Sequence, residues 1–261
     1  MTDVLVRVEN VAKTFVRRGI EHVALDGVSL DVEKGSFVCL VGRSGCGKST
    51  LLNLVAGLIA PTRGRIIESG RVVDGPRLNV GYLTQKDTLL PWRDVLRNIE
   101  MPLEIRKLER AERERKAVAL IERVGLQGRE RAYPRELSGG MARRASLARM
   151  LIAQPELLLL DEPFSALDAQ LRQEMQNELL RLWAGSGNTV IFVTHDIEEA
   201  IAMGDRVVVL GQRGRVVHDE GIALPRPRDV IAVRRRPEFH VVEERLWEAL
   251  SAGSPATEVA S

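Results

Sequence analysis

Apolar residues along this chain follow two patterns, and each pattern predicts a different kind of strand. In residues 4–8 and 28–32, valine and leucine recur at every second position, which is typical of strands with one buried face. Four further stretches are apolar throughout, at residues 37–41, 157–160, 190–193 and 207–210. Continuous apolar runs of this length favour parallel strands that are covered on both faces. The pattern therefore predicts an α/β chain.

The apolar spacing changes in the middle of the chain. Apolar residues between Ile105 and Val124 recur at helical intervals within a stretch that is dense in Arg, Lys and Glu. We expect residues 87–150 to form a mostly helical subdomain, inserted into a domain that covers residues 1–220. Residues 221–261 form a Pro/Arg-rich extension with a short amphipathic stretch and a polar tail. The arginines at 226–236 are expected to be solvated, and contact with anionic lipid headgroups is the alternative.

The composition excludes several classes of protein. The 38 Lys and Arg nearly balance the 36 Asp and Glu, so the formal net charge of +2 gives no indication of a nucleic-acid partner. The longest apolar run, residues 51–60, is shorter than the ~18 residues that span a bilayer, and the N-terminus has no signal-peptide pattern. Cys39 and Cys46 are too few for a disulfide framework and lack zinc-site spacing, which favours a reducing compartment. We expect a chain that is cytosolic or held at a membrane only through a partner.

The strongest motif follows directly after the apolar run at 37–41. It fits the phosphate-binding pattern G-x-x-x-x-G-K-[ST] and consists of Gly42, Arg43, Ser44, Gly45, Cys46, Gly47, Lys48 and Ser49. Glycines let backbone N–H groups curl around phosphate oxygens, and the predicted helix that follows, with Thr50, adds the positive end of its dipole. Lys48 is placed to neutralise the β- and γ-phosphates, and the Ser49 hydroxyl to ligate Mg²⁺. A strand before this loop and a helix after it indicate nucleotide phosphate binding.

A second element follows the apolar run at 157–160. Asp161 and Glu162 lie at the C-terminal end of this predicted strand, the edge at which open α/β sheets bind ligands. Asp161 is a candidate Mg²⁺ ligand, directly or through water, and Glu162 is a candidate general base for an attacking water. An acidic pair alone is typical of a solvated strand end. Together with the phosphate-binding loop, it indicates a nucleotide hydrolase or a kinase without separating the two.

A third motif narrows the class. Ser138, Gly139 and Gly140 form a Ser-Gly-Gly at a predicted helix start, which exposes N–H groups and a hydroxyl to a phosphate. With the preceding leucine, this motif resembles the LSGGQ signature of the ABC ATPases, and Met141 departs from the usual glutamine. In that family the signature closes on the γ-phosphate held by the opposite subunit. The departure puts a polar contact from residue 141 in doubt and leaves the resemblance intact.

Further motifs resemble those of the same family and lie in the expected order. Gln85 resembles the glutamine that touches Mg²⁺ and its water and relays contact with the membrane partner. Asp168 resembles the end of the loop that crosses the dimer interface, and His195 resembles the histidine that contacts the γ-phosphate. Phe15 resembles the aromatic that stacks on adenine, and an aromatic in the core of the first sheet is the open alternative.

The resemblance implies a fold, an activity and an assembly. The fold is α/β, a P-loop NTPase of the ABC type with an N-terminal antiparallel β subdomain and an inserted α-helical subdomain. The implied activity is hydrolysis of ATP with Mg²⁺, with Lys48, Gln85, Glu162 and His195 as catalytic residues. Two such subunits, as a homodimer, would sandwich two ATP molecules and drive integral-membrane permease subunits.

The sequence is less specific about the transported solute and the kind of transporter than about the ATPase itself. The Leu-Leu-Pro-Trp stretch at 89–92 and Met141 resemble the importers of nitrate, sulfonate and taurine. Trp92 would then lie near the groove that receives a coupling helix of the permease, although capping of a helix is an alternative role. Such a subunit sits on the cytoplasmic side of the bacterial plasma membrane and works indirectly with a periplasmic solute-binding protein. Another importer or exporter class and a soluble ABC ATPase remain alternatives, whereas a P-loop kinase has no reason to keep Ser138, Asp168 and His195 together.

Overall fold

A computed structural model describes residues 3–85 and 88–252, and its contacts divide the chain into two compact units. Unit 1 contains residues 1–77 and 187–261, and unit 2 contains residues 78–186. The predicted polar tail lies after residue 252, outside the described residues. The predicted domain limits, 1–220 and 221–261, remain predictions.

Four strands of unit 1 form an antiparallel sheet in the order β2-β1-β4-β5. They are β1 (Val4–Arg17), β2 (Ile20–Glu33), β4 (Arg63–Glu68) and β5 (Arg71–Val72). Arg18 and Gly19 connect β1 to β2 with φ of 52° and 78°, the left-handed pair that a tight two-residue hairpin uses. Val6 and Val8 of β1 are buried, as their alternation predicts. The expected antiparallel β subdomain is thereby confirmed.

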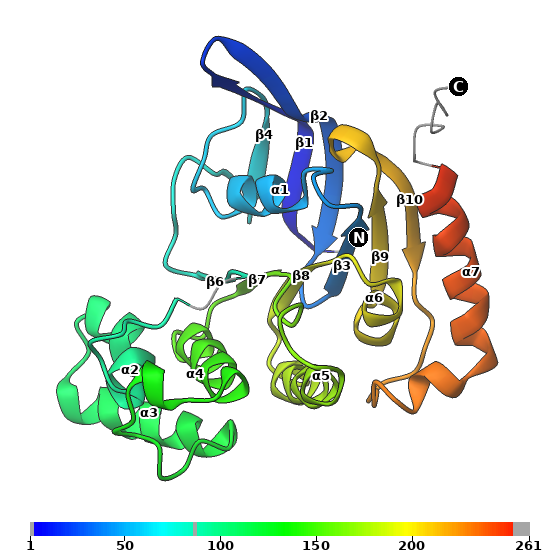
Figure 1. Ribbon diagram of the computed structural model, residues 1–261. Helices are drawn as coiled ribbons and strands as arrows, with labels where there is room; N and C mark the ends of the chain where they lie inside the picture. The colour runs from blue at the N-terminus through cyan, green and yellow to red at the C-terminus, as the bar shows by residue number, and fades with distance from the viewer. Residues whose placement is uncertain (1–2, 86–87, 253–261) are drawn as a thin grey trace. The chain divides into compact units, whose positions relative to one another are not determined.

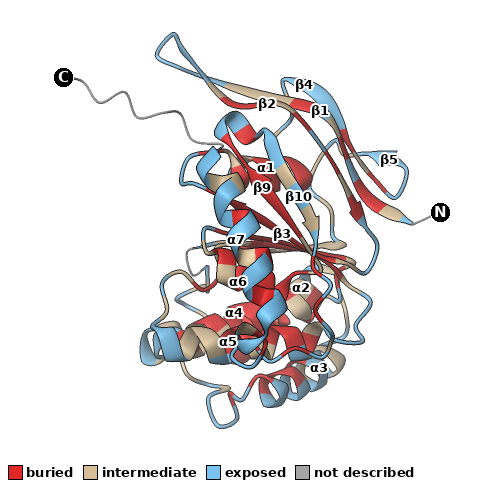
Figure 2. Ribbon diagram, turned by 90° about the vertical axis from the view of Figure 1, so that its right-hand side faces the viewer, coloured by how far each residue is buried: buried red, intermediate tan, exposed pale blue. Residues whose placement is uncertain are grey.

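The other strands of unit 1 carry the phosphate-binding loop. β3 (Phe37–Gly42) pairs in parallel with β8 (Thr189–Thr194) and with β9 (Arg206–Leu210), and β10 (Val216–Gly221) runs antiparallel to β9. Every residue of β3 and β8 is buried, which explains their continuous apolar runs. Figure 2 shows the same burial along β3 and β9. The helices of this unit are α1 (Lys48–Val55), α6 (Ile197–Met203) and α7 (Pro237–Ala252), and α7 runs beside β10 (Figure 1).

The segment after β10 packs against unit 1, so the prediction of solvated arginines is wrong at two positions. Arg228 is only 8% exposed, and Arg226 pairs with Asp205 at 2.7 Å. The Arg228 guanidinium donates hydrogen bonds to four backbone carbonyls, those of Ile201, Gly204, Ile222 and Leu224. Buried carbonyls need donors, and this one side chain supplies them where α6 ends and the extension begins. A run of arginines read along the sequence does not reveal such partners.

Unit 2 contains the predicted helical insertion. Its strands β6 (Val80–Leu83) and β7 (Leu157–Asp161) pair in parallel. Between them lie α2 (Val95–Ile105), α3 (Arg110–Arg123), the 3₁₀ turn η1 (Pro134–Glu136) and α4 (Gly139–Leu151), and α5 (Ala169–Trp183) follows β7. Figure 1 shows α2, α3 and α4 gathered into one group. Ile121 and Val124 are buried as their spacing predicts, whereas Ile105, the last residue of α2, is exposed.

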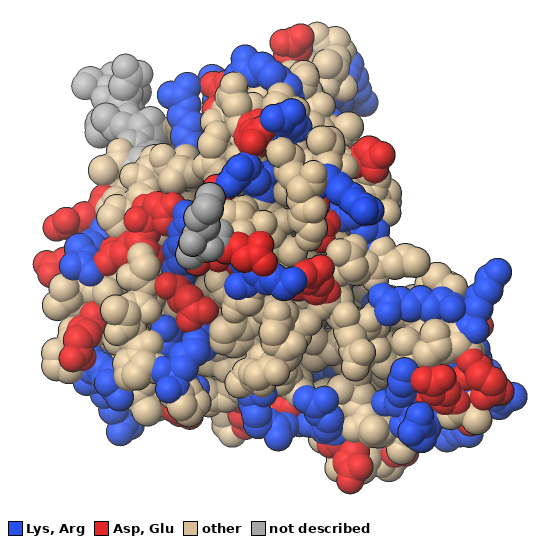
Figure 3. Space-filling view, turned by 180° about the vertical axis from the view of Figure 1, so that it is seen from behind, with Lys and Arg blue, Asp and Glu red and all other residues tan. Residues whose placement is uncertain are grey.

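Charged side chains of both signs are interspersed on the face shown in Figure 3. Several charged side chains of the described residues form ion pairs, as Arg7 does with Asp31 at 3.0 Å. This mixture agrees with the formal net charge of +2. Within the described ranges, no helix is both long enough and apolar enough to cross a membrane.

Candidate functional site

The phosphate-binding loop connects β3 to α1 through a tightly packed backbone. Gly45 and Gly47 have φ of 81° and 111°, in the left-handed region that favours glycine. A Cβ on Gly47 would lie 2.5 Å from Leu25 Cδ2, so a side chain has no room there. At the other end of the loop, a Cβ on Gly42 would lie 2.6 Å from the Leu210 carbonyl oxygen. The glycines therefore let the loop pack directly against β2 and β9.

Lys48 opens α1 and folds back over the loop. It is only 5% exposed, and its Nζ donates hydrogen bonds to the carbonyls of Gly42 at 2.6 Å and Arg43 at 3.1 Å. Ser49 and Thr50 follow in the first turn of α1, and Ser49 is exposed. The ammonium group and the N–H groups of this first turn concentrate positive charge at one place, which is the arrangement that binds phosphate.

His195 emerges from the strand next to β3. Val41 of β3 pairs with Thr194 of β8, so the phosphate-binding loop and His195 leave neighbouring parallel strands at the same edge. Thr194 Oγ1 accepts a hydrogen bond from the Asp196 N–H at 3.0 Å, and the Asp196 carboxylate accepts one from the Glu199 N–H at 3.1 Å. These two bonds fix the turn into α6 around the exposed imidazole. Unit 1 thus brings the predicted loop and the predicted histidine to one edge of a sheet.

Asp161 ends β7, and Glu162 begins the turn that follows. Glu162 has φ of 43°, a left-handed conformation that is uncommon for residues other than glycine and concentrates at functional sites. The Glu162 carbonyl accepts hydrogen bonds from the Ser165 N–H at 3.3 Å and from Ser165 Oγ at 3.1 Å. Gln85 Nε2 lies 3.5 Å from the same Ser165 Oγ. Burial and the nearby charge of Asp161 raise the pKa of Tyr82.

Ser138 and Asp168 cap two helices of unit 2. Ser138 Oγ accepts a hydrogen bond at 3.3 Å from the backbone N–H three residues later, and Asp168 Oδ1 accepts one from the Leu171 N–H at 3.0 Å. A Cβ on Gly140 would lie 2.7 Å from Leu171 Cδ2, whereas a Cβ on Gly139 would meet nothing within 4 Å. Gly140 therefore packs against α5, and Gly139 leaves the helix start open. The cap of α4 uses only the backbone of residue 141, so the methionine there does not disturb it.

Two arginines of α4 were not singled out from the sequence. Arg143 is 3% exposed and donates a hydrogen bond to the Thr84 carbonyl at 2.9 Å. Arg149 donates a hydrogen bond to the Thr88 carbonyl at 2.8 Å. Together they hold the backbone on both sides of Gln85 to the helix that begins with the Ser-Gly-Gly motif. Their acceptors are backbone carbonyls about 60 positions away, which a sequence pattern does not identify.

Phe15 lies on β1 and is 40% exposed, so it is not an aromatic of the buried core. The Lys13 ammonium lies 5.2 Å from the centroid of the Phe15 ring, a cation–π distance. In the pairing of β1 with β2, Phe15 stands opposite His22, so both residues belong to the same face of the sheet. Stacking of Phe15 on a base remains a prediction.

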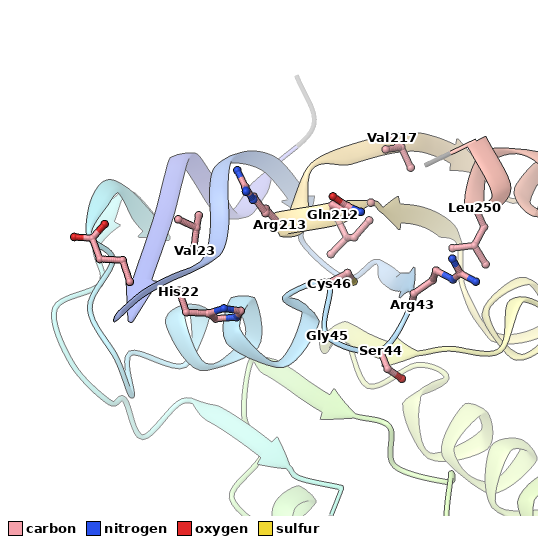
Figure 4. Close-up of a pocket in the computed structure, with 13 residues that line it drawn as sticks. His22, Val23, Arg43, Ser44, Gly45, Cys46, Gln212, Arg213, Val217 and Leu250 are labelled. Atoms are coloured by element: carbon pink, nitrogen blue, oxygen red, sulfur yellow. The ribbon is translucent and has the colours of Figure 1, made fainter. Parts of the chain in front are cut away.

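A cavity of about 910 Å³ adjoins the phosphate-binding loop within unit 1 (Figure 4). The loop contributes Arg43, Ser44, Gly45 and Cys46 to its lining. Burial raises the pKa of the Cys46 thiol. The remaining lining residues come from β2 and from the C-terminal part of the chain, which sequence reasoning did not connect with the loop. The predicted site residues Gln85, Asp161, Glu162 and Asp168 belong to unit 2.

The strand, glycine loop and buried lysine of unit 1 define the class of P-loop nucleotide-binding proteins. Comparison with protein-family models adds a match of residues 25–165 to the ABC transporter family. The chain belongs to this family, and it is an ATP-hydrolysing transport ATPase. The resemblance drawn from its motifs is thereby confirmed.

Relatives match almost the whole chain. It is 43% identical over 252 residues to an uncharacterized ABC transporter ATP-binding protein of Methanocaldococcus jannaschii, covering 95% of this chain and 94% of that protein. It is 40% identical to the taurine import ATP-binding protein TauB of Rhizobium johnstonii, covering 93% and 95% of the two chains. It is 43% identical to the aliphatic sulfonates import ATP-binding protein SsuB 1 of Burkholderia cenocepacia, covering 97% of this chain and 74% of that protein.

A solved structure supports the same fold. A dimeric ATP-binding cassette in a post-hydrolysis state, bound to ADP and Pi, aligns with a TM-score of 0.76 at 30% sequence identity. The alignment covers 85% of this chain and 100% of that chain. The expected ABC-type fold, with its antiparallel β subdomain and helical insertion, is confirmed.

Proposed function

We propose that this chain powers a bacterial importer of a small anion, such as taurine, a sulfonate or nitrate. The main support for a role in transport is the helix start at Ser138, Gly139 and Gly140. Ser138 caps this helix, and Gly139 leaves its start open to a phosphate held by another subunit. Relatives named for the import of taurine and of aliphatic sulfonates, at 40% and 43% identity, support the solute class. The Leu-Leu-Pro-Trp stretch at 89–92 supports it as well.

The phosphate-binding loop holds the nucleotide in this proposal. Its N–H groups and the Lys48 ammonium neutralise the phosphates, and His195, at the same sheet edge, contacts the γ-phosphate. Glu162 accepts a proton from the attacking water as general base. The Glu162 backbone has a left-handed conformation, and its carbonyl accepts a hydrogen bond from Ser165. Both features fix the direction of the Cα–Cβ bond of Glu162, which supports its role as a positioned base.

Magnesium fits the donor atoms that the proposal assigns to it. Ser49, Gln85 and Asp161 offer a hydroxyl, an amide and a carboxylate oxygen, the hard ligands that Mg²⁺ prefers. When bound, Mg²⁺ would supply positive charge next to the phosphates of the nucleotide. Gln85 is held near the Glu162 turn through Ser165, so one polar cluster in unit 2 serves both the cation and the water.

The proposed assembly is a homodimer with membrane partners. Each ATP lies between the phosphate-binding loop of one chain and the Ser138 helix start of the other, and Asp168 crosses the interface. ATP does work because it binds the closed dimer better than the open one. Permease subunits anchor the dimer to the cytoplasmic side of the plasma membrane, and a periplasmic solute-binding protein delivers the solute to them. Trp92, 70% exposed, is the proposed contact for a permease helix.

Purification from native membranes tests this proposal. A tagged chain, extracted with detergent, should bring down an integral-membrane permease, and Trp92→Ala should weaken that association while ATP hydrolysis by the free subunit is kept. In reconstituted vesicles, taurine, an alkanesulfonate or nitrate should stimulate hydrolysis through the binding protein. A partnerless protein would favour a soluble ABC ATPase, and stimulation by an unrelated solute would favour another importer class.

A further inference from the structure

The helix that follows His195 is held in place by its neighbours. All residues of α6 are buried except Glu198. A helix of 7 residues is too short to be stable by itself in water. The neighbours of α6 are the strands β3, β8 and β9, together with α7 and the 3₁₀ turn η3 (Val233–Arg235). Figures 1 and 2 both show α7 beside α6. Residues 222–252, which we call the C-terminal strap, therefore supply part of the packing on which α6 depends.

Two arginines of the C-terminal strap hold the last turn of α6. The final carbonyls of a helix have no partner within the helix, so donors from elsewhere must reach them. Arg228 donates hydrogen bonds to two carbonyls at this end, and Arg226 donates one to the Met203 carbonyl at 2.6 Å. Arg226 also pairs with Asp205, whose carboxylate accepts a hydrogen bond from the Phe37 N–H at 3.0 Å. This end of α6 is thereby joined both to the strap and to the start of β3.

A third arginine of the C-terminal strap reaches the first turn of α6. Arg234 Nη1 lies 3.1 Å from Glu198 Oε2, and Glu198 is the third residue after His195. The side chains of Arg234 and Glu198 are 26% and 47% exposed, so this ion pair lies at the surface, where its charges can be changed without burying one. The strap therefore contacts α6 near both of its ends.

His195 lies between a strand that the sheet fixes and a helix that the C-terminal strap helps to fix. β8 ends at Thr194, the residue after Val193, and α6 begins at Ile197. Only His195 and Asp196 connect the two elements, so the backbone of these two residues must absorb any tilt of α6. Such a tilt rotates the Cα–Cβ bond of His195 and moves its imidazole. Misplacement of a catalytic group by about 1 Å can cost about 100-fold in rate.

We propose that the C-terminal strap positions His195 for ATP hydrolysis. Arg226, Arg228 and Arg234 hold α6 at its two ends, and α6 in turn sets the direction of the imidazole. The three arginines are positioning residues, because they act through the helix and not on the nucleotide. This inference rests on the proposed contact of His195 with the γ-phosphate. It assigns a role in the ATPase reaction to a segment that the motifs of the sequence did not connect with the site.

Charge reversal of the surface pair in the full-length protein tests this inference. Arg234→Glu and Glu198→Arg each place two like charges side by side, and the double variant Arg234→Glu/Glu198→Arg restores an ion pair. Arg7→Glu is the matched control, because it disrupts a surface ion pair of 3.0 Å between β1 and β2 of the same unit. The turnover number kcat and the Michaelis constant KM for ATP hydrolysis with Mg²⁺ are measured for each variant.

Each single reversal should lower kcat about five- to ten-fold while KM for ATP changes less than about two-fold, because the phosphate-binding loop is untouched. The double variant should recover at least about half of the wild-type kcat. Arg7→Glu should hydrolyse ATP like the wild type. In a His195→Ala background, Arg234→Glu should lower the residual turnover no further, since its effect passes through the imidazole.

Wild-type kcat in both single reversals overturns the inference, and so does a double variant that is no more active than the single ones. An equal fold-loss from Arg234→Glu with and without His195 also overturns it, because that result shows a general effect on the fold. Wild-type turnover of His195→Ala alone contradicts instead the proposed contact of His195 with the γ-phosphate, so the two failures are distinguishable.

Discussion

The two glycines at the start of α4 should respond differently to the same substitution. A methyl group on Gly139 meets nothing within 4 Å, whereas one on Gly140 would lie 2.7 Å from Leu171 Cδ2 and 2.9 Å from Leu171 Cδ1. Both branches of the leucine are too close, so rotation about its last bond does not relieve the overlap. Either Leu171 changes rotamer or the start of α5, which Asp168 caps, moves away.

The contacts of the two glycines set the expected changes in the free energy of unfolding. Gly139→Ala gains roughly 0.5–1 kcal/mol, because alanine restricts the unfolded chain and favours the helix. Gly140→Ala has the same gain but loses about 1–3 kcal/mol to overpacking against Leu171. Gly140→Ala should therefore be less stable than Gly139→Ala by about 1–3 kcal/mol. At about 2–4 °C per kcal/mol for a chain of this size, its melting temperature should lie several degrees lower.

ATP turnover should instead be impaired in Gly139→Ala, the more stable of the two variants. The open side of Gly139 is the surface proposed to meet the phosphate held by the partner subunit, so its added methyl should lower ATP turnover about ten-fold, or ~1.4 kcal/mol, in a well-folded protein. Thermal unfolding of both variants and the wild type checks the predicted difference in stability, and steady-state ATP hydrolysis checks the predicted loss of turnover. Equal melting temperatures would refute the packing of Gly140 on Leu171. Normal turnover of Gly139→Ala would refute the phosphate surface.

Three further predictions follow from the packing of unit 1. Gly47→Ala places a methyl group against Leu25 at a φ of 111°. This substitution should lower the free energy of unfolding by about 2–4 kcal/mol and weaken ADP binding. A wild-type free energy of unfolding in denaturant melts and a wild-type ADP affinity in calorimetry would contradict this prediction. Arg228→Met leaves four backbone carbonyls without their donor and should lower the free energy of unfolding by about 3 kcal/mol, seen as a lower urea midpoint. Burial raises the pKa of Cys39 and Cys46, so little thiolate forms at about pH 8. Alkylation of the folded protein by iodoacetamide should therefore be at least about ten-fold slower than alkylation in urea. Equal rates would show that the thiols are accessible in the folded protein.

Local patterns predicted the elements of this protein well. The alternation at 4–8 gave a strand of the antiparallel sheet, and the apolar run at 37–41 gave the buried strand before the phosphate-binding loop. A helix start was expected at Ser138, and its hydroxyl caps α4 there. These features depend on residues that are close in sequence, so propensity and spacing are sufficient to predict them.

Contacts between distant parts of the chain escaped prediction for a physical reason. Arg143, Arg149 and Arg228 find their acceptors on backbone carbonyls, and a carbonyl has no residue type that a sequence could display. Gln212 and Leu250 line the same cavity as the phosphate-binding loop, and Gly47 and Gly214 both pack against Leu25. Such packing becomes visible only once the strands are paired in space.

Glu162→Gln tests whether Glu162 activates water for ATP hydrolysis in a dimeric transport ATPase. Glutamine has the same size and leaves the turn at φ of 43° in place, while it removes the base. We predict that ATP still binds with wild-type affinity, that turnover falls by about 10²–10⁴-fold, and that a stable ATP-bound dimer accumulates on size-exclusion chromatography. Turnover equal to that of the wild type would contradict the assignment of Glu162 and the hydrolytic mechanism built on it.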